Sequence, residues 1–248
     1  MTAPLTRDVA YEDGPTRMAG LLVAPGDGQP HPGVLLLHDA FGLSDEMVDV
    51  ARRLAALGLS VLAADVWGDR ALPSTEAEIG PLIGGMVADR GRWMGRVAAA
   101  HAAAVAQPEV DPAPLVALGY CFGGAGVLEY VRTGGALRGA ISVHGGLDLL
   151  APGWDGATPG SRVLVCTGAD DPMATPGMLA DLQQGMDGAG VDWEVQIYSG
   201  TTHAFTSPRA RHSPRPDVVA YHARSSARAW AATTRFLREL HPTAQRAA

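Results

Sequence analysis

The sequence predicts an α/β protein with a mostly parallel central sheet and helices on both faces. Two observations support this fold class. Short apolar runs alternate with helical segments from residue 33 onward, and such alternation is typical of a parallel sheet. Most of these runs are apolar throughout, as expected of strands that are buried on both faces. We expect one domain over residues 1–248, with its core between about 15 and 240.

The first strand–helix–strand unit has the clearest pattern. The apolar run 34–37 predicts a buried strand, and the run 61–64 predicts its neighbour. Between them, Ser44 is placed to cap a helix whose apolar stripe ends at Gly58. The same patterns predict strands at 115–118, 140–143, 163–166 and 193–198, helices at 86–106, 123–133, 177–186 and 217–240, and loops at 69–80 and 207–216.

The composition limits the possible partners. Hydrophobic residues make up 47% of the chain and charged residues 18%, which fits a globular protein with a large core. The net charge of −7 argues against nucleic acid and anionic membranes, because both attract clustered basic residues. All 19 basic residues are Arg, which excludes a Schiff-base or P-loop lysine. We therefore expect a small-molecule partner.

The cysteine content and the absence of long apolar runs favour a reducing compartment. Cys121 and Cys166 are the only cysteines, too few for a disulfide framework. Residues 1–16 lack the apolar stretch of a signal peptide, and no apolar run reaches the roughly 18 residues of a membrane span. We expect a cytoplasmic protein, where a free thiolate persists. We expect a monomer, with a dimer as the alternative.

The segment 119–124, Gly-Tyr-Cys-Phe-Gly-Gly, is the most specific local signal. It lies between a predicted strand and a predicted helix and matches the nucleophile elbow G-x-S-x-G, with Cys121 in place of serine. The elbow places the nucleophile at a helix N-terminus, where the helix dipole favours a thiolate. It also aims the N–H of Phe122 at a developing oxyanion. The alternative is a buried cysteine in a glycine-rich turn, which is how we interpret Cys166 within its apolar strand.

The acid and the base are expected later in the chain, because nucleophile elbows are followed by the acid and then by histidine. Asp170 and Asp171 follow the strand 163–166, and we favour Asp170 because Pro172 comes directly after Asp171. His203 follows the last predicted strand and is the expected base. The alternatives are a turn aspartate and a solvent-exposed loop histidine.

The loop after the first buried strand is expected to supply the second oxyanion donor. Its sequence, His-Asp-Ala-Phe-Gly over residues 38–42, makes the N–H of Ala40 the natural candidate. Removing such a donor typically costs about 3 kcal/mol of barrier. A metal site is the competing use of Cys, His and Asp, but the chain has none of the ligand spacings that indicate one.

Taken together, these segments resemble the dienelactone hydrolase family of α/β hydrolases over roughly residues 15–240. The resemblance implies the α/β-hydrolase fold and a triad of Cys121, His203 and Asp170. It also implies hydrolysis of dienelactone to maleylacetate, in the degradation of chlorinated aromatics, without a cofactor. The matching residues are His38-Asp39-Ala40-Phe41-Gly42-Leu43, Asp65-Val66-Trp67-Gly68, Gly119-Tyr120-Cys121-Phe122-Gly123-Gly124, Gly168-Ala169-Asp170 and His203-Ala204-Phe205.

Two departures from the family pattern concern the thiol and the substrate. In the family the loop acid that helps control thiol ionisation is usually Glu, whereas the corresponding residue here is Asp39, one methylene shorter. The alternative role of Asp39 is a backbone hydrogen bond at the strand end. Family members grip a substrate carboxylate with arginines; the candidates here are Arg90, Arg92 and Arg209, with a plain surface role as the alternative.

The sequence thus predicts a cofactor-independent hydrolase of a small ester or lactone that forms a thioester acyl-enzyme. A thioesterase or acyl-transfer enzyme would use the same three residues. The remaining alternative is a non-catalytic small-molecule-binding protein that retains the fold, against which the order of nucleophile, acid and base argues.

Overall fold

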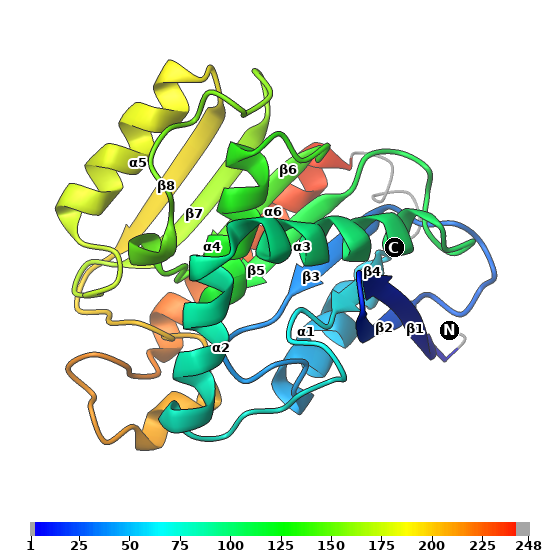
Figure 1. Cartoon of the computed structure of the whole chain (residues 1–248), viewed down its shortest axis with the longest axis horizontal. Coiled ribbons are helices and arrows are strands. Elements are labelled where there is room, and N and C mark those ends of the chain that lie inside the picture. The colour runs from blue at the N-terminus through cyan, green and yellow to red at the C-terminus, as the bar shows by residue number, and fades with distance from the viewer. Residues whose placement is uncertain (1–2, 242–248) are drawn as a thin grey trace. The chain divides into compact units, whose positions relative to one another are not determined.

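The computed structural model describes residues 3–241 and divides the chain into two compact units (Figure 1). The first unit runs to Ala117 and includes His241; the second is Leu118–Leu240. The described residues contain eight strands in a mostly parallel arrangement with helices, which confirms the predicted α/β class. The expectation of a single domain stays a prediction. No described helix is long and apolar enough to cross a membrane.

The first unit is built on the strands β1 (Leu5–Asp13), β2 (Thr16–Ala24), β4 (Ser60–Ala64) and β3 (Gly33–Leu37), in that order. β1 and β2 form an antiparallel hairpin, β2 is antiparallel to β4, and β3 is parallel to β4 with Val34 opposite Val61. The sequence patterns did not reveal β1 and β2. In β1 the apolar signal is weak, because it buries only Val9 and its other side chains are exposed or half-buried.

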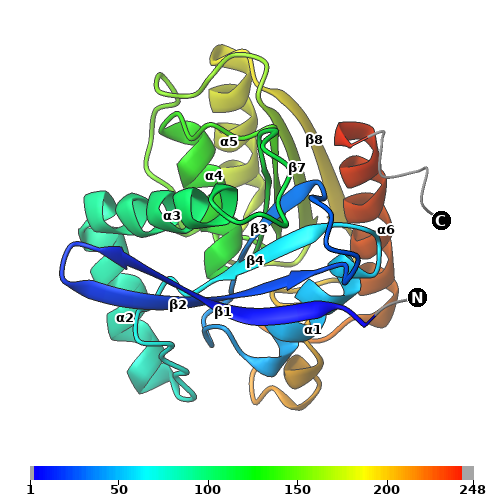
Figure 2. The same cartoon turned by 90° about the vertical axis from the view of Figure 1, so that its right-hand side faces the viewer.

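The helices of the first unit are α1 (Asp45–Ala55), α2 (Glu76–Ala88) and α3 (Arg90–Val105). In Figure 2, α3 and α1 lie on opposite faces of β4. The predicted single helix 86–106 is in fact two helices, because the backbone leaves the helical region at Asp89, whose carboxylate caps α3. The predicted loop 69–80 is wrong from Glu76 onward, where Thr75 and Glu78 form a capping box.

The second unit contains three parallel strands, β6 (Gly139–Val143), β7 (Arg162–Gly168) and β8 (Asp192–Tyr198), in that order. β5 (Val116–Tyr120) runs from the first unit into the second. Figures 1 and 2 show α4 (Phe122–Arg132) and α5 (Pro176–Gly188) on one face of these strands and α6 (Ala223–Leu240) on the other.

The loops of the second unit begin where its strands end. All five residues of β6 are buried, as are six of the seven in β7. These buried strands fix the positions at which the loops after them begin. The predicted helix 217–240 begins only at Ala223, because the preceding residues run alongside the loop of His203. The predicted loop 207–216 includes a short 3-10 helix at Pro208–His212.

Candidate active site

Cys121 occupies a strained turn between β5 and α4. Its backbone has φ 51° and ψ −113°, in the region with positive φ that non-glycine residues rarely adopt. The turn is fixed by two hydrogen bonds: the Cys121 N–H donates to the Val143 carbonyl at 3.1 Å, and the Ala125 N–H donates to the Cys121 carbonyl at 3.1 Å. The side chain is half-buried. The strand, the turn and the helix are arranged as the elbow motif predicts.

The glycines of the elbow are required by close backbone contacts. A Cβ at Gly119 would overlap the carbonyl of Gly123. A Cβ at Gly124 would lie 2.8 Å from the Cα of Gly145, closer than real Cβ atoms approach a backbone. A larger residue at Gly119 would therefore force the turn of Cys121 apart, and one at Gly124 would push the start of α4 away from Gly145.

The imidazole of His203 joins Cys121 to a carboxylate. Its Nε2 lies 3.1 Å from the Cys121 sulfur, and its Nδ1 lies 2.8 Å from Oδ2 of Asp171. The side chains of His203 and Asp171 are 3% and 0% exposed, so the carboxylate and the ring meet out of contact with solvent. A sulfur, an imidazole and a carboxylate that are far apart in the chain thus form one hydrogen-bonded series.

The carboxylate in this series is Asp171, so the choice of Asp170 was wrong. Residues 168–171 form a turn in which the Asp171 N–H donates to the Gly168 carbonyl at 3.4 Å. Asp170 is exposed on this turn, whereas Asp171 is buried beneath it. Pro172 does not hinder Asp171, whose Oδ1 also accepts from the Met173 N–H at 2.8 Å. The two central residues of this turn, Ala169 and Asp170, face outward.

The loop of His203 is held from both sides by main-chain hydrogen bonds. The His203 N–H donates to the Val218 carbonyl at 3.0 Å, and the Ala220 N–H donates to the His203 carbonyl at 3.2 Å. The Asp170 N–H donates to the Thr201 carbonyl at 3.0 Å, which fastens the two loops to each other. The base is therefore positioned by backbone contacts as well as by Asp171.

The charges in this series favour an imidazolium at His203. Burial opposes the charged ring, but the Cys121 thiolate and the hydrogen bond that the ring donates to Asp171 outweigh it and raise the pKa of His203 to about 10. A cationic ring beside the sulfur stabilises a thiolate, which is the reactive form of cysteine.

His144 was not singled out by the sequence analysis, although it contacts this series. It follows the last residue of β6 directly and is 2% exposed. Its ring centroid lies 5.3 Å from that of His203, with the two planes inclined at 67°. The available signal was its position, because it follows the apolar run 140–143 at the carboxyl end of a parallel strand, where site residues gather.

The second cysteine is part of the core, as predicted. Cys166 lies within β7 and is 0% exposed. Burial raises the pKa of its thiol to about 12, so it stays protonated near neutral pH. Any thiol chemistry of the described residues therefore belongs to Cys121. The described residues contain no cluster of three or more His, Cys, Asp or Glu side chains arranged as metal ligands.

The residues predicted around the oxyanion lie next to expected elements, but their roles stay predictions. Ala40 and Asp39 follow β3, and Phe122 is the first residue of α4. Asp39 is 7% exposed and its Oδ1 accepts from the Phe41 N–H at 2.9 Å, the kind of backbone hydrogen bond considered as its alternative role. The control of thiol ionisation predicted for Asp39 stays a prediction.

The three arginines considered for anion binding occupy different surroundings. Arg92 is half-exposed and forms an ion pair with Asp89 at 3.1 Å, at the start of α3. Arg90 is the first residue of the same helix, and Arg209 is exposed in the loop that follows His203. The ion pair of Arg92 fits a surface role, and substrate binding by any of the three stays a prediction.

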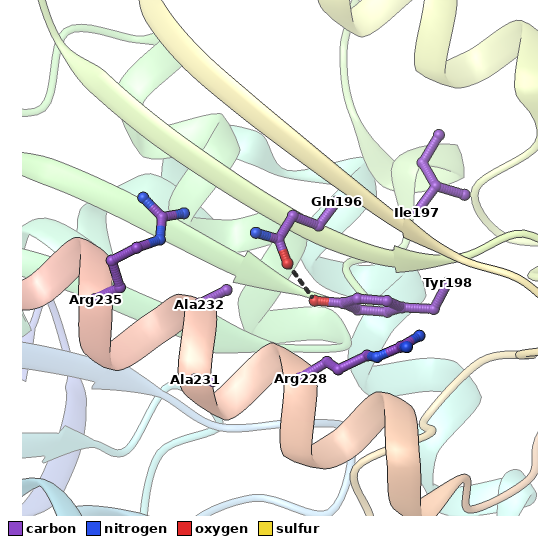
Figure 3. A pocket seen from close by; sticks show the side chains of 7 residues that line it. All are labelled: Gln196, Ile197, Tyr198, Arg228, Ala231, Ala232 and Arg235. Atoms are coloured by element: carbon purple, nitrogen blue, oxygen red, sulfur yellow. Dashed lines mark hydrogen bonds between the residues drawn. The ribbon is translucent and has the colours of Figure 1, made fainter.

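An open groove of about 540 Å³ lies elsewhere in the second unit, between β8 and α6 (Figure 3). None of Cys121, Asp171 and His203 lines it. The O–H of Tyr198 donates to Gln196 within the groove at 2.9 Å. It has no paired nucleophile and base, so it is not a candidate for covalent chemistry. Its lining residues are Gln196, Ile197, Tyr198, Arg228, Ala231, Ala232 and Arg235.

Comparisons with known proteins place this arrangement in a family. A solved dienelactone hydrolase-like promiscuous phosphotriesterase from metagenomic libraries, P91, is 38% identical; the match covers 96% of this chain and 99% of P91, with a TM-score of 0.86. A protein of Escherichia coli K12, provisionally named a carboxymethylenebutenolidase, is 26% identical over 81% of this chain and 74% of its own length.

A protein of Methylorubrum extorquens with the same provisional name is 30% identical over 50% of this chain; the match covers only 43% of that protein. The model of the dienelactone hydrolase family matches residues 18–241, nearly all of the described chain. The fold is accordingly the α/β-hydrolase fold, and the chain belongs to the dienelactone hydrolase family.

Proposed function

We propose that the chain is a cofactor-independent hydrolase of a small ester or lactone, with Cys121 as nucleophile, His203 as base and Asp171 as the residue that orients His203. The observation that supports this most is the continuous series of contacts from Asp171 through His203 to the Cys121 sulfur, at 2.8 and 3.1 Å. Membership of the dienelactone hydrolase family, whose curated relatives are named for lactone hydrolysis, supports the reaction class.

The reaction proceeds in two halves. His203 takes the proton of the thiol, the sulfur attacks the carbonyl carbon, and collapse of the tetrahedral intermediate breaks the bond to the alcohol oxygen. His203 returns the proton to that oxygen, which leaves a thioester on Cys121. In the second half His203 takes a proton from water, the hydroxide attacks the thioester, and the sulfur leaves with the acid as product. For a lactone, alcohol and acid are two ends of one molecule.

Asp171 acts on this reaction through the ring of His203. Its buried carboxylate accepts the Nδ1 hydrogen, so Nε2 is the nitrogen that takes up the thiol proton and returns it to the leaving alcohol. The carboxylate also stabilises the imidazolium that forms at each proton transfer. The backbone N–H groups of Phe122 and Ala40 are the proposed donors to the oxyanion.

The test is a pre-steady-state burst with p-nitrophenyl acetate. We expect wild type and Cys166→Ala to release about one equivalent of nitrophenolate per chain at once, and Cys121→Ala to release none. We expect His203→Ala to lose several orders of magnitude in kcat. A panel of esters, lactones, acyl thioesters and one phosphotriester, the substrate class in the name of P91, then ranks substrates.

The panel separates the alternatives. Preferred turnover of thioesters, or transfer of the acyl group to an added alcohol, would replace simple hydrolysis by thioester hydrolysis or acyl transfer. If wild type gives neither turnover nor a mass increase of one acyl group on Cys121 with any ester or lactone, the proposal fails. The chain would then be a small-molecule-binding protein that retains the fold.

A further inference from the structure

The side chain of His144 spans from the end of β6 to the loop of His203. Its backbone N–H donates to the Cys166 carbonyl at 2.8 Å, which fixes the residue at the carboxyl end of β7. Its Nε2 lies 2.8 Å from Oγ1 of Thr206, three residues beyond His203. A buried ring on one loop thus holds a hydroxyl on another.

The turn that contains His144 also contacts the elbow. On one side of it, the Val143 carbonyl accepts from the Cys121 N–H at 3.1 Å. On the other side, the Gly146 N–H lies 3.4 Å from the Cys121 carbonyl. The backbone around His144 is therefore bonded to the nucleophile, while its side chain is bonded to the loop of the base.

The ring of His144 also packs against aromatic neighbours from the same loop. Besides the contact with His203, its centroid lies 5.2 Å from that of Phe205, with the planes at 80°. The backbone of His144 has φ 40°, a strained value for a non-glycine residue. Such strain persists only where the surrounding contacts hold it, and it is commonly found at functional sites.

The surroundings of His144 keep its ring neutral. Burial, together with repulsion from a charged His203, holds the pKa of His144 well below its usual value. With the hydrogen on Nε2, the ring donates to Thr206 and leaves only a lone pair at Nδ1, which has no partner among the described residues. The titratable groups of its own unit around it are Tyr120, at 5.8 Å between rings, the Cys121–His203–Asp171 series and the nearby Asp148.

On the basis of the proposed function, we infer that His144 is a positioning residue that keeps the Nε2 of His203 against the Cys121 sulfur. It does so by linking the elbow to the loop of the base through Thr206 and by packing against the imidazole. Because it stays neutral, it adds no charge that would oppose the imidazolium of His203. It does not itself touch the reacting atoms.

The experiment removes the link from either end. His144→Phe keeps a flat buried ring but no hydrogen bond, and Thr206→Val removes only the hydroxyl. The matched control is Thr202→Val, because Oγ1 of Thr202 is buried in the same loop and has no partner in the described chain. Each protein is labelled with ¹⁵N-histidine, and the ring of His203 is titrated by NMR. The alkylation rate of Cys121 with iodoacetamide at pH 7 and kcat and KM with p-nitrophenyl acetate are measured in parallel.

We expect wild type and Thr202→Val to keep His203 protonated up to about pH 10. In His144→Phe and Thr206→Val the pKa of His203 should fall toward 6.5, and alkylation of Cys121 and kcat should fall by about tenfold or more with KM little changed. The inference is wrong if both variants match wild type in the NMR titration and the alkylation rate.

The two proposals fail in different ways. A wild-type protein with a protonated His203 and a reactive Cys121 but no turnover contradicts the proposed hydrolysis and leaves the role of His144 intact. Should His144→Phe fail to fold, Thr206→Val alone decides the outcome, because valine replaces threonine with little change of shape.

Discussion

Asp170 and Asp171 are adjacent carboxylates with opposite surroundings. Asp171 is buried, and its two oxygens accept from the His203 ring and from the Met173 N–H. Asp170 is exposed, and its contact with the neighbouring loop is made by its backbone N–H rather than by its carboxylate. The side chain of Asp171 therefore controls which nitrogen of His203 carries the hydrogen, and the side chain of Asp170 does not.

We predict that Asp171→Asn lowers kcat by roughly 10⁴-fold, the loss known for the corresponding change in a serine protease. An amide that turns its NH₂ group toward Nδ1 favours the wrong tautomer, which leaves Nε2 with a hydrogen and no lone pair for the thiol. Asp170→Asn is the matched control and should stay within twofold of wild type. The measurement is kcat with p-nitrophenyl acetate, with circular dichroism as the check on folding. Equal losses in both variants would remove Asp171 from the mechanism.

The elbow between β5 and α4 depends on glycine for steric reasons. At Gly119 a methyl group meets the carbonyl of Gly123, which cannot move without displacing the first turn of α4. This turn also fixes the unusual backbone of Cys121. The elbow therefore does not tolerate even a methyl group at Gly119.

We predict that Gly119→Ala destabilises the protein by more than about 2 kcal/mol, because the overlap is with backbone and cannot be relieved by a side-chain rotation. Gly84→Ala is the matched control. Gly84 lies in α2 with open space around it, so alanine should stabilise the helix by about 0.5–1 kcal/mol. Thermal unfolding compares the two: the melting temperature should fall in Gly119→Ala and rise in Gly84→Ala. A fall of similar size in both would show that the overlap is not the cause.

The strands with a continuous apolar run were predictable from the sequence, and β1, which has almost no apolar signal, was not. The runs 34–37, 61–64 and 140–143 lie within one residue of β3, β4 and β6, because continuous apolar residues leave little choice. β1 was missed because its outward side chains are polar and its apolar signal is a single residue, Val9. The break at Asp89 was missed because the helical pattern continues through this aspartate and does not indicate that it caps a second helix.

The sequence predicts the three segments of the candidate site, but it does not single out Asp171 or His144. The order of elbow, acid-bearing loop and histidine-bearing loop follows from the chain, and it gave Cys121 and His203. The choice between two adjacent aspartates depends on the turn at 168–171, and the contact of His144 depends on a backbone with φ 40°. Neither conformation is encoded by a local residue pattern, because tertiary contacts impose both.

Folding buries a histidine whose surroundings favour the neutral ring, and this links the stability of the molecule to pH. His38 in the first unit is 1% exposed and is bonded on both sides of its ring. Its Nδ1 lies 2.7 Å from the Asp39 carbonyl and must donate, while its Nε2 accepts from the Val66 N–H at 3.0 Å. A proton on Nε2 would lose the second bond and place a charge in the core. Burial, the largest cause, lowers the pKa of His38 in the folded protein.

This arrangement predicts that the free energy of unfolding falls at acid pH, and that His38→Gln removes the part of this fall that His38 causes. Below about pH 6.5 the unfolded chain takes up a proton at residue 38 and the folded chain does not, so the free energy of unfolding falls as the pH falls. Between pH 6.5 and 5.5 the contribution of one such histidine reaches up to about 1 kcal/mol. Urea unfolding at pH 7.5, 6.5 and 5.5 should therefore show a smaller fall in the free energy of unfolding toward acid pH in His38→Gln than in wild type.

The control is His212→Gln, at an exposed histidine, which should follow wild type. Because wild type and His38→Gln share every titrating group except His38, including His203, the difference between their slopes isolates His38 whatever each variant's absolute stability. Parallel slopes for His38→Gln and wild type would mean that the folded protein accepts a proton at His38 after all.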